Sequence, residues 1–126
     1  MKNIVIFLCI LIIGSTAMFA QQQNQQILKP VINYSEIEFC LQLLNNIELR
    51  GKEVDALMEI RSIMINELQK GIKEKKQLED SAILMFTFSQ AQNLLNFLQR
   101  ATLTGAQVER YKRLADAIIV SSKPQK

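Results

Sequence analysis

The sequence predicts a mostly helical α+β domain made of two strand–helix–turn–helix repeats, and three observations lead to this fold class. The chain aligns with itself without a gap at an offset of 54 residues, with six identities in the 31 pairs from Tyr34/Phe88 to Met64/Ile118. The matched positions include a serine before a helix, a ladder of leucines and a turn glycine. The leucines follow the i, i+3, i+4, i+7 spacing of an amphipathic helix. An internal repeat of this length constrains the fold before any other feature does.

The first 20 residues have the pattern of a cleaved secretory signal peptide. Lys2 gives a positive start, residues 4–13 are an unbroken apolar run, and small residues follow. Charge, a short apolar core and small residues are the expected order. Cleavage after Ala20 fits the change to a glutamine-rich sequence, and cleavage after Ala17 stays open. An uncleaved anchor would need about 20 apolar residues. We therefore expect a periplasmic or secreted protein without stable membrane insertion after cleavage.

The rest of the chain is expected to form one domain, because about 105 residues suffice for a modest core. We expect a flexible glutamine-rich extension over residues 21–29 and a disordered tail over 122–126. Between them lie the first repeat (30–70), a charged linker (71–81) and the second repeat (82–121).

Each repeat opens with a short β-prone stretch, at residues 31–34 and 83–88. Ser35 and Ser89 follow these stretches and fit the S-x-x-E/Q pattern of a helix capping box. A helix is therefore expected after each serine, and the stretch before it is expected to be a strand. In the alternative, an all-α four-helix bundle, the same stretches are extended connectors or helical extensions.

Two amphipathic helices are expected in each repeat, joined by a turn that contains Gly51 or Gly105. The first helix runs for about eleven residues after the serine. The second covers about 52–70 in one repeat and 106–120 in the other. A unit of about 50 residues does not bury both of its helices alone. The repeats are therefore expected to pack as one four-helix domain with two short strands that pair across a pseudo-twofold axis.

The composition argues against several kinds of active site. The chain has no histidine, and Cys40 is the only cysteine left after signal cleavage. A Ser-His or Cys-His nucleophile pair is therefore excluded, and a structural zinc site lacks its usual four ligands. Cys40 lies among apolar residues and is expected to be a buried thiol; a disulfide to a second chain is the alternative. We predict no catalytic residue, no metal and no cofactor, and hence no enzymatic activity.

Charge is the property in which the repeats differ. Residues 30–80 hold ten acidic and seven basic residues, a net −3, whereas residues 81–126 hold two acidic and six basic residues, a net +4. Arg100, Arg110 and Arg113 are the candidate partner-binding residues, and Arg110 and Arg113 share a helix face. An anionic partner, an anionic membrane surface and the acidic first repeat are the possible counterparts. We favour the first repeat or a partner protein.

The function that follows is an exported, non-enzymatic interaction module. Its expected partner is an unknown protein or a second copy of the chain, and no nucleic acid, because an exported chain seldom meets one. The alternative is a carrier of a small apolar ligand held between the repeats, near Phe86, Phe88, Phe97 and Tyr111.

Overall fold

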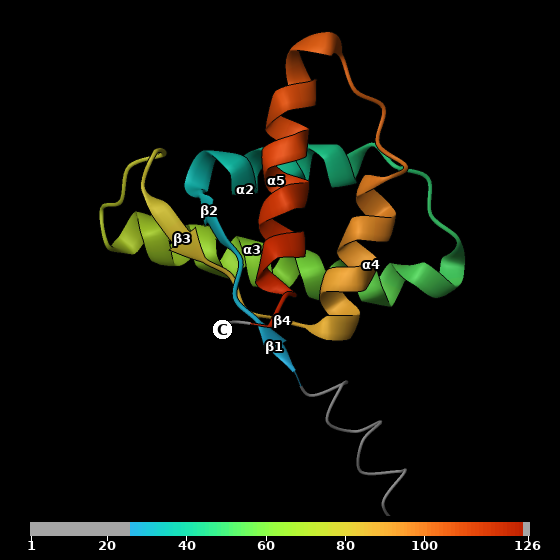
Figure 1. Ribbon diagram of the computed structural model, residues 1–126, viewed down its shortest axis with the longest axis horizontal. Helices are drawn as coiled ribbons and strands as arrows, with labels where there is room; N and C mark the ends of the chain where they lie inside the picture. Colours follow the sequence, from blue (N-terminus) through green and yellow to red (C-terminus); the bar gives the residue numbers. More distant parts are fainter. Residues whose placement is uncertain (1–25, 125–126) are drawn as a thin grey trace, which may run out of the picture.

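The protein is a mostly helical α+β domain, as predicted, with four helices and four short strands in the described part of the chain. The structure is a computed structural model that describes residues 26–124; the predicted signal segment lies outside this range. In chain order the elements are β1 (Ile27–Leu28), β2 (Val31–Asn33), α2 (Tyr34–Asn45), η1 (Gly51–Glu53), α3 (Val54–Lys73), β3 (Ser81–Ile83), β4 (Phe86–Thr87), α4 (Phe88–Leu98), η2 (Gly105–Gln107) and α5 (Val108–Ser121) (Figure 1).

The predicted 54-residue offset relates the elements of the two halves. Helix α4, the 3₁₀ turn η2 and helix α5 each begin 54 residues after α2, η1 and α3. Backbone hydrogen bonds follow the same relation: the Tyr34 N–H donates to Asp80 O at 3.2 Å, and the Phe88 N–H donates to Gln26 O at 3.1 Å. Positions 54 residues apart are called counterparts below.

The strands form one antiparallel ribbon in which each half pairs with the other. Strand β1 pairs with β4 and β2 with β3, and both pairs keep the same register, with Leu28 opposite Phe86 and Ile32 opposite Ala82. Pro30 separates the two pairs because it has no N–H to donate; its carbonyl accepts from the Leu84 N–H at 3.1 Å. Each strand thus pairs with a strand of the other half.

Two of the four strands were not expected. Residues 27–28, placed by the sequence in a flexible extension, are held in β1 by their pairing with β4. Residues 81–83 begin the partner strand, so the ribbon is longer than the predicted stretches. The charged linker is correspondingly shorter, because α3 continues to Lys73.

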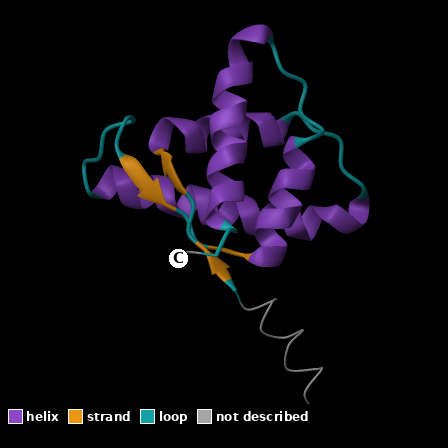
Figure 2. Ribbon diagram, in the orientation of Figure 1, coloured by secondary structure: helices purple, strands orange, loops and turns teal. Residues whose placement is uncertain are grey.

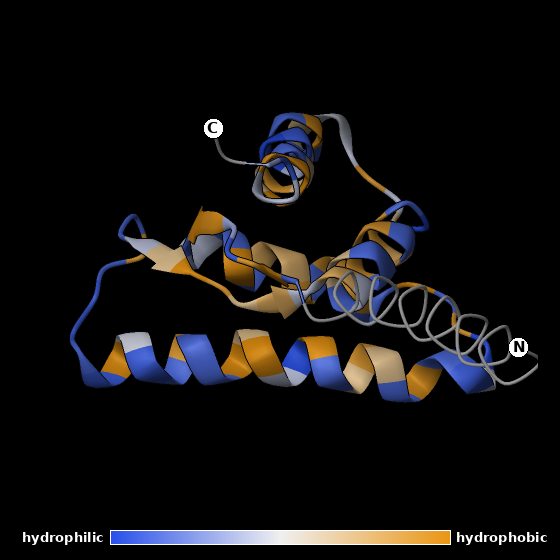
Figure 3. Ribbon diagram, turned by 60° about the horizontal axis from the view of Figure 1, so that its bottom comes forward, coloured by the Kyte–Doolittle hydropathy of each residue, from blue (hydrophilic) through white to orange (hydrophobic). Residues whose placement is uncertain are grey.

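The elements lie in three layers. Helices α2 and α4 form the middle layer with the ribbon, α3 covers one side and α5 covers the other (Figures 1 and 3). The strands lie beside the helices at one end of the molecule (Figure 2). Side chains from the inner face of the ribbon and from all four helices form one buried cluster, which includes Leu28, Ile32, Ile37, Phe39, Cys40, Leu44, Ile60, Met64, Leu84, Phe86, Leu94, Phe97, Leu114 and Ile118.

The helix caps differ from the prediction. Helix α4 is capped by Thr87, whose hydroxyl accepts from the Gln90 N–H at 3.1 Å while the Gln90 side chain accepts from the Thr87 N–H at 2.9 Å. The capping box therefore lies two residues before the predicted one, and Ser35 and Ser89 lie within the first turns. Helix α2 has Asn33 at its N-cap without a side-chain cap bond.

Candidate functional site

Among the described residues, the shortest ion pair between the two halves joins Arg100 to Glu53. Arg100 follows α4 and reaches the 3₁₀ turn before α3, where Nη1 donates to Glu53 Oε1 at 2.8 Å and Nη2 to Glu53 Oε2 at 2.6 Å. Nη1 also approaches the Glu48 carbonyl oxygen at 3.3 Å. The bond from Arg100, with a second from the Arg50 N–H, lowers the pKa of Glu53 to about 2. The paired carboxylate thus remains ionised in any near-neutral environment.

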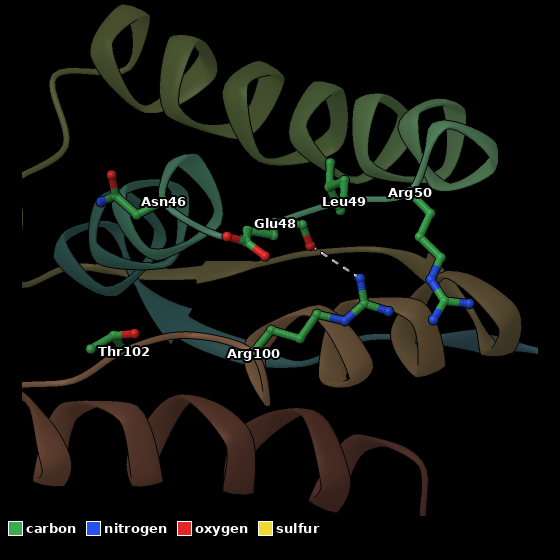
Figure 4. A pocket seen from close by; sticks show the side chains of 6 residues that line it. All are labelled: Asn46, Glu48, Leu49, Arg50, Arg100 and Thr102. Atoms are coloured by element: carbon green, nitrogen blue, oxygen red, sulfur yellow. Dashed lines mark hydrogen bonds between the residues drawn. The ribbon is translucent and has the colours of Figure 1, made fainter.

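A cleft of about 520 Å³ lies beside this ion pair, between the two inter-helix loops. It is lined by Asn46, Glu48, Leu49, Arg50, Arg100 and Thr102 (Figure 4). The Arg50 and Arg100 guanidinium groups lie at one end of the cleft, Asn46 and Thr102 lie at the other, and the Glu48 carboxylate lies between them. Among the described residues, Arg50 forms no ion pair. The lining thus holds two cations, Arg50 and Arg100, and the Glu48 carboxylate, and Glu53 is paired with Arg100 beside the cleft.

Arg110 and Arg113 meet a second glutamate of the first half. Arg110 Nε lies 3.6 Å and Arg113 Nη2 lies 3.5 Å from Glu36 Oε1. Arg110 also donates to the Ser35 carbonyl at 3.1 Å, and its guanidinium stacks over the Phe39 ring, 4.4 Å from the centroid. Glu36 is nine-tenths buried, and its Oε2 has no hydrogen-bond partner. This cluster leaves a net positive charge, with the Arg113 side chain mostly exposed.

The predicted arginines therefore divide between two places. Arg100 lines the inter-loop cleft, whereas Arg110 and Arg113 come together at the N-terminal turn of α2. All three contact acidic residues of the first half. The charge asymmetry favours either this half or a partner protein as the binding partner of the arginines. Their predicted role in partner binding stays a prediction.

Sequence reasoning assigned none of Arg50, Glu36 and Glu53 to a site. Glu36 and Glu53 could have been found by comparing counterparts, because the second half has Gln90 and Gln107 there. Gln107 keeps the local bond, accepting from the Thr104 N–H at 3.0 Å as Glu53 accepts from the Arg50 N–H at 2.9 Å. The glutamates of the first half thus carry a negative charge that their glutamine counterparts lack. This charge difference is the signal of a contact outside the turn.

The remaining chemistry-bearing groups are few. Cys40 is buried, as predicted, and burial raises the pKa of its thiol to about 12. Such a thiol is inert as a nucleophile near neutral pH. Within residues 26–124, no three Asp, Glu or Cys side chains are grouped to hold a metal ion. In the same range, no helix is long and apolar enough to cross a membrane.

Comparison with known proteins gave no match among family models, curated proteins or solved structures.

Proposed function

We propose that this protein is an exported, non-enzymatic interaction module that binds a carboxylate-bearing segment of a partner protein in the cleft between its inter-helix loops. The carrying observation is the Arg50 guanidinium in the cleft lining, which forms no ion pair among the described residues. An incoming carboxylate would pair with this group. Guanidinium groups bind carboxylates through paired, charge-assisted hydrogen bonds, which give both energy and geometric selectivity.

The rest of the cleft suits a peptide better than a small apolar molecule. Asn46 and Thr102 supply hydrogen-bonding groups, and Leu49 supplies an apolar contact. A volume of about 520 Å³ accommodates a few residues of a partner rather than a whole domain. The cleft is thus the recognition point of a larger contact.

The non-enzymatic part of the proposal is supported by residue chemistry. A histidine-free chain lacks the commonest general acid–base, and the buried Cys40 thiol is protonated near neutral pH. Export is supported by the N-terminal pattern of charge, apolar core and small residues.

Site-specific photocrosslinking in the producing cell tests the proposal. A photoreactive amino acid at Thr102 places the probe in the cleft, and one at Lys76, an exposed lysine before β3, serves as the control position. In the exported fraction, we expect one protein to crosslink at position 102. This crosslink should be lost in Arg50→Glu, which reverses the charge of the arginine. Equal crosslinking at both positions, or crosslinks that survive Arg50→Glu, would contradict a cleft-bound partner.

The ligand-carrier alternative is not favoured by a specific observation. Phe86 and Phe97 are fully buried core residues. The inter-loop cleft is not lined by Phe86, Phe88, Phe97 or Tyr111.

A further inference from the structure

Two hollows lie where α5 and the residues after it meet the segment 26–33, and the two together are called the groove. The hollows have volumes of about 140 Å³ and 260 Å³. Val31 and Asn33 face Arg113 and Ala117 in the first hollow, and Ile27 and Lys29 face Ser121 and Lys123 in the second. The wall formed by residues 27–33, called the strand wall, is about 20 Å long at about 3.3 Å per residue.

The groove wall continues into an uncovered apolar surface. Ile27, Val31, Ile83 and Met85 point away from the core on the outer face of the ribbon, and each is 46–57% exposed. Val31 and Ile83 are directly opposite each other across the two strands. Exposed apolar side chains that gather on one face, rather than being scattered singly, mark a contact surface.

Three residues that line the first hollow are smaller than their counterparts. On the other side of the molecule, the counterparts of Val31, Ile32 and Ala117 are Met85, Phe86 and Ile63, which are all larger. There the Gln90 side chain also bonds to Glu59 at 3.4 Å, where the groove side has Glu36 and Arg113. The first hollow, beside α5, is thus lined by smaller side chains than the corresponding positions beside α3 carry.

The charge of the groove is positive. Arg113 stands at one end and Lys29 and Lys123 at the other, and the one acidic side chain among the lining residues is Glu36, which is buried and already paired. Such a groove attracts an anionic ligand through complementary charge.

We infer that this groove binds an extended acidic peptide segment of a partner protein, with apolar residues on its floor and carboxylates at Arg113 and at Lys29 or Lys123. An extended chain is favoured because the two hollows follow one another along the extended segment 26–33, and the exposed apolar side chains beside them suit alternate side chains of such a chain. A flat lipid surface would not enter the hollows. A second copy would have to supply an extended acidic segment, and apart from Glu48 the described acids outside the groove lie in helices, turns or bends.

This inference rests on the proposal that the protein is an interaction module, but it concerns a separate surface. The groove and the inter-loop cleft share no lining residue. Variants of one surface therefore leave the other intact, and the two proposals fail independently.

Selection from a random library of peptides of about seven residues on the immobilised full mature chain tests the inference, since this length matches the strand wall. We expect enriched peptides to be acidic and to alternate acidic with apolar residues. Ala117→Ile should weaken their binding about tenfold or more by filling the groove, and the fold should accept it because its counterpart Ile63 occupies the same place beside α3.

Lys29→Glu gives a second, independent variant, because it reverses one exposed charge of the groove without filling it. Lys76→Glu makes the same change in charge outside the groove and should leave binding unchanged. Urea unfolding of each variant shows whether the fold is kept. Cleft variant Arg50→Glu should also leave the selected peptides bound.

Four results would overturn the inference. They are the absence of enriched peptides, enrichment of neutral or basic peptides, binding that Ala117→Ile and Lys29→Glu leave unchanged, and binding to phosphatidylglycerol vesicles without any peptide selection. A dimer in sedimentation equilibrium that Ala117→Ile dissociates would assign the groove to a second copy instead, and would likewise overturn it.

Discussion

At the scale of single residues, the two halves differ most informatively where glutamate corresponds to glutamine. Glu36 and Glu53 each meet arginines of the second half, whereas their counterparts Gln90 and Gln107 accept bonds from nearby backbone N–H groups. A glutamine keeps the local bond of a turn or cap but cannot form an ion pair. At position 53 the glutamate therefore adds an ion pair between the halves while it keeps the local bond that Gln107 makes.

Glu53→Gln should reduce the free energy of unfolding at neutral pH and remove an acid-dependent part of it. The folded pKa of Glu53, about 2, lies below its ordinary value of 4.5. The ion pair therefore stabilises the fold fully above about pH 4.5, and this contribution is lost as the pH falls toward 2. Urea unfolding at a series of pH values should show wild type and variant converging on acidification.

A double-mutant cycle supplies the control for Glu53→Gln. Arg100→Gln alone should lower the free energy of unfolding at neutral pH and remove its acid-dependent part, as Glu53→Gln does. The double variant should be little less stable than either single variant. Parallel stability curves for wild type and Glu53→Gln at all pH values would contradict the assigned role of the ion pair.

At the scale of elements, one glycine fixes how α2 meets α3. A Cβ added at Gly71 would lie 2.5 Å from Tyr34 Cε1 and 2.8 Å from Cζ, and the buried Tyr34 ring has little room to move. Gly71→Ala should therefore destabilise the fold by about 1–3 kcal/mol through overpacking. Urea unfolding measures the change.

Gly51→Ala is the matched control, since no atom lies within 4 Å of its added Cβ and its φ is not positive. It should be neutral or stabilising by up to about 1 kcal/mol, because alanine restricts the unfolded chain. Equal effects of the two substitutions would show that the Tyr34 ring adapts to a methyl group.

Much of the secondary structure could be predicted from the sequence, because a helix is marked by the local periodicity of its apolar residues. The apolar periodicity located all four helices, and Gly51 and Gly105 marked the turns between them. The ribbon was predicted only in part, because β1 and β3 are short and their pairing with distant strands decides their structure. The capping box was misplaced by two residues, since Thr87–Gln90 and Ser89–Gln92 both fit the pattern and only the strand end selects between them.

The candidate site could be predicted less well than the fold. The charge asymmetry pointed to Arg100, Arg110 and Arg113, but no local pattern shows that two inter-helix loops come together to form the cleft. The first hollow of the groove is lined by residues smaller than their counterparts, as Ala117 is smaller than Ile63. The effect of this difference in side-chain size can be seen only when the arrangement of the helices in layers is known.

At the scale of the whole molecule, the two halves depend on each other for their secondary structure and their core. Every strand pairs across the halves, and the middle layer contains one helix from each. The halves are also not interchangeable. Arg113, which faces Glu36, has Glu59 as its counterpart in the first half.

The fragments 26–75 and 76–124 should therefore be largely unfolded alone and fold together when mixed. The first fragment should not form a homodimer in place of the native pair, because the symmetric arrangement would set Glu36 against Glu59 of another copy, and like charges in a partly buried contact are unfavourable. Circular dichroism of each fragment and of the equimolar mixture, with sedimentation to establish the stoichiometry, measures this.

Glu59→Arg in the first fragment should make self-association possible by restoring the opposite charge. Cooperative unfolding of fragment 26–75 as a monomer would show that one half folds unaided; a stable homodimer of the unmodified fragment would show that charge does not select the native pairing.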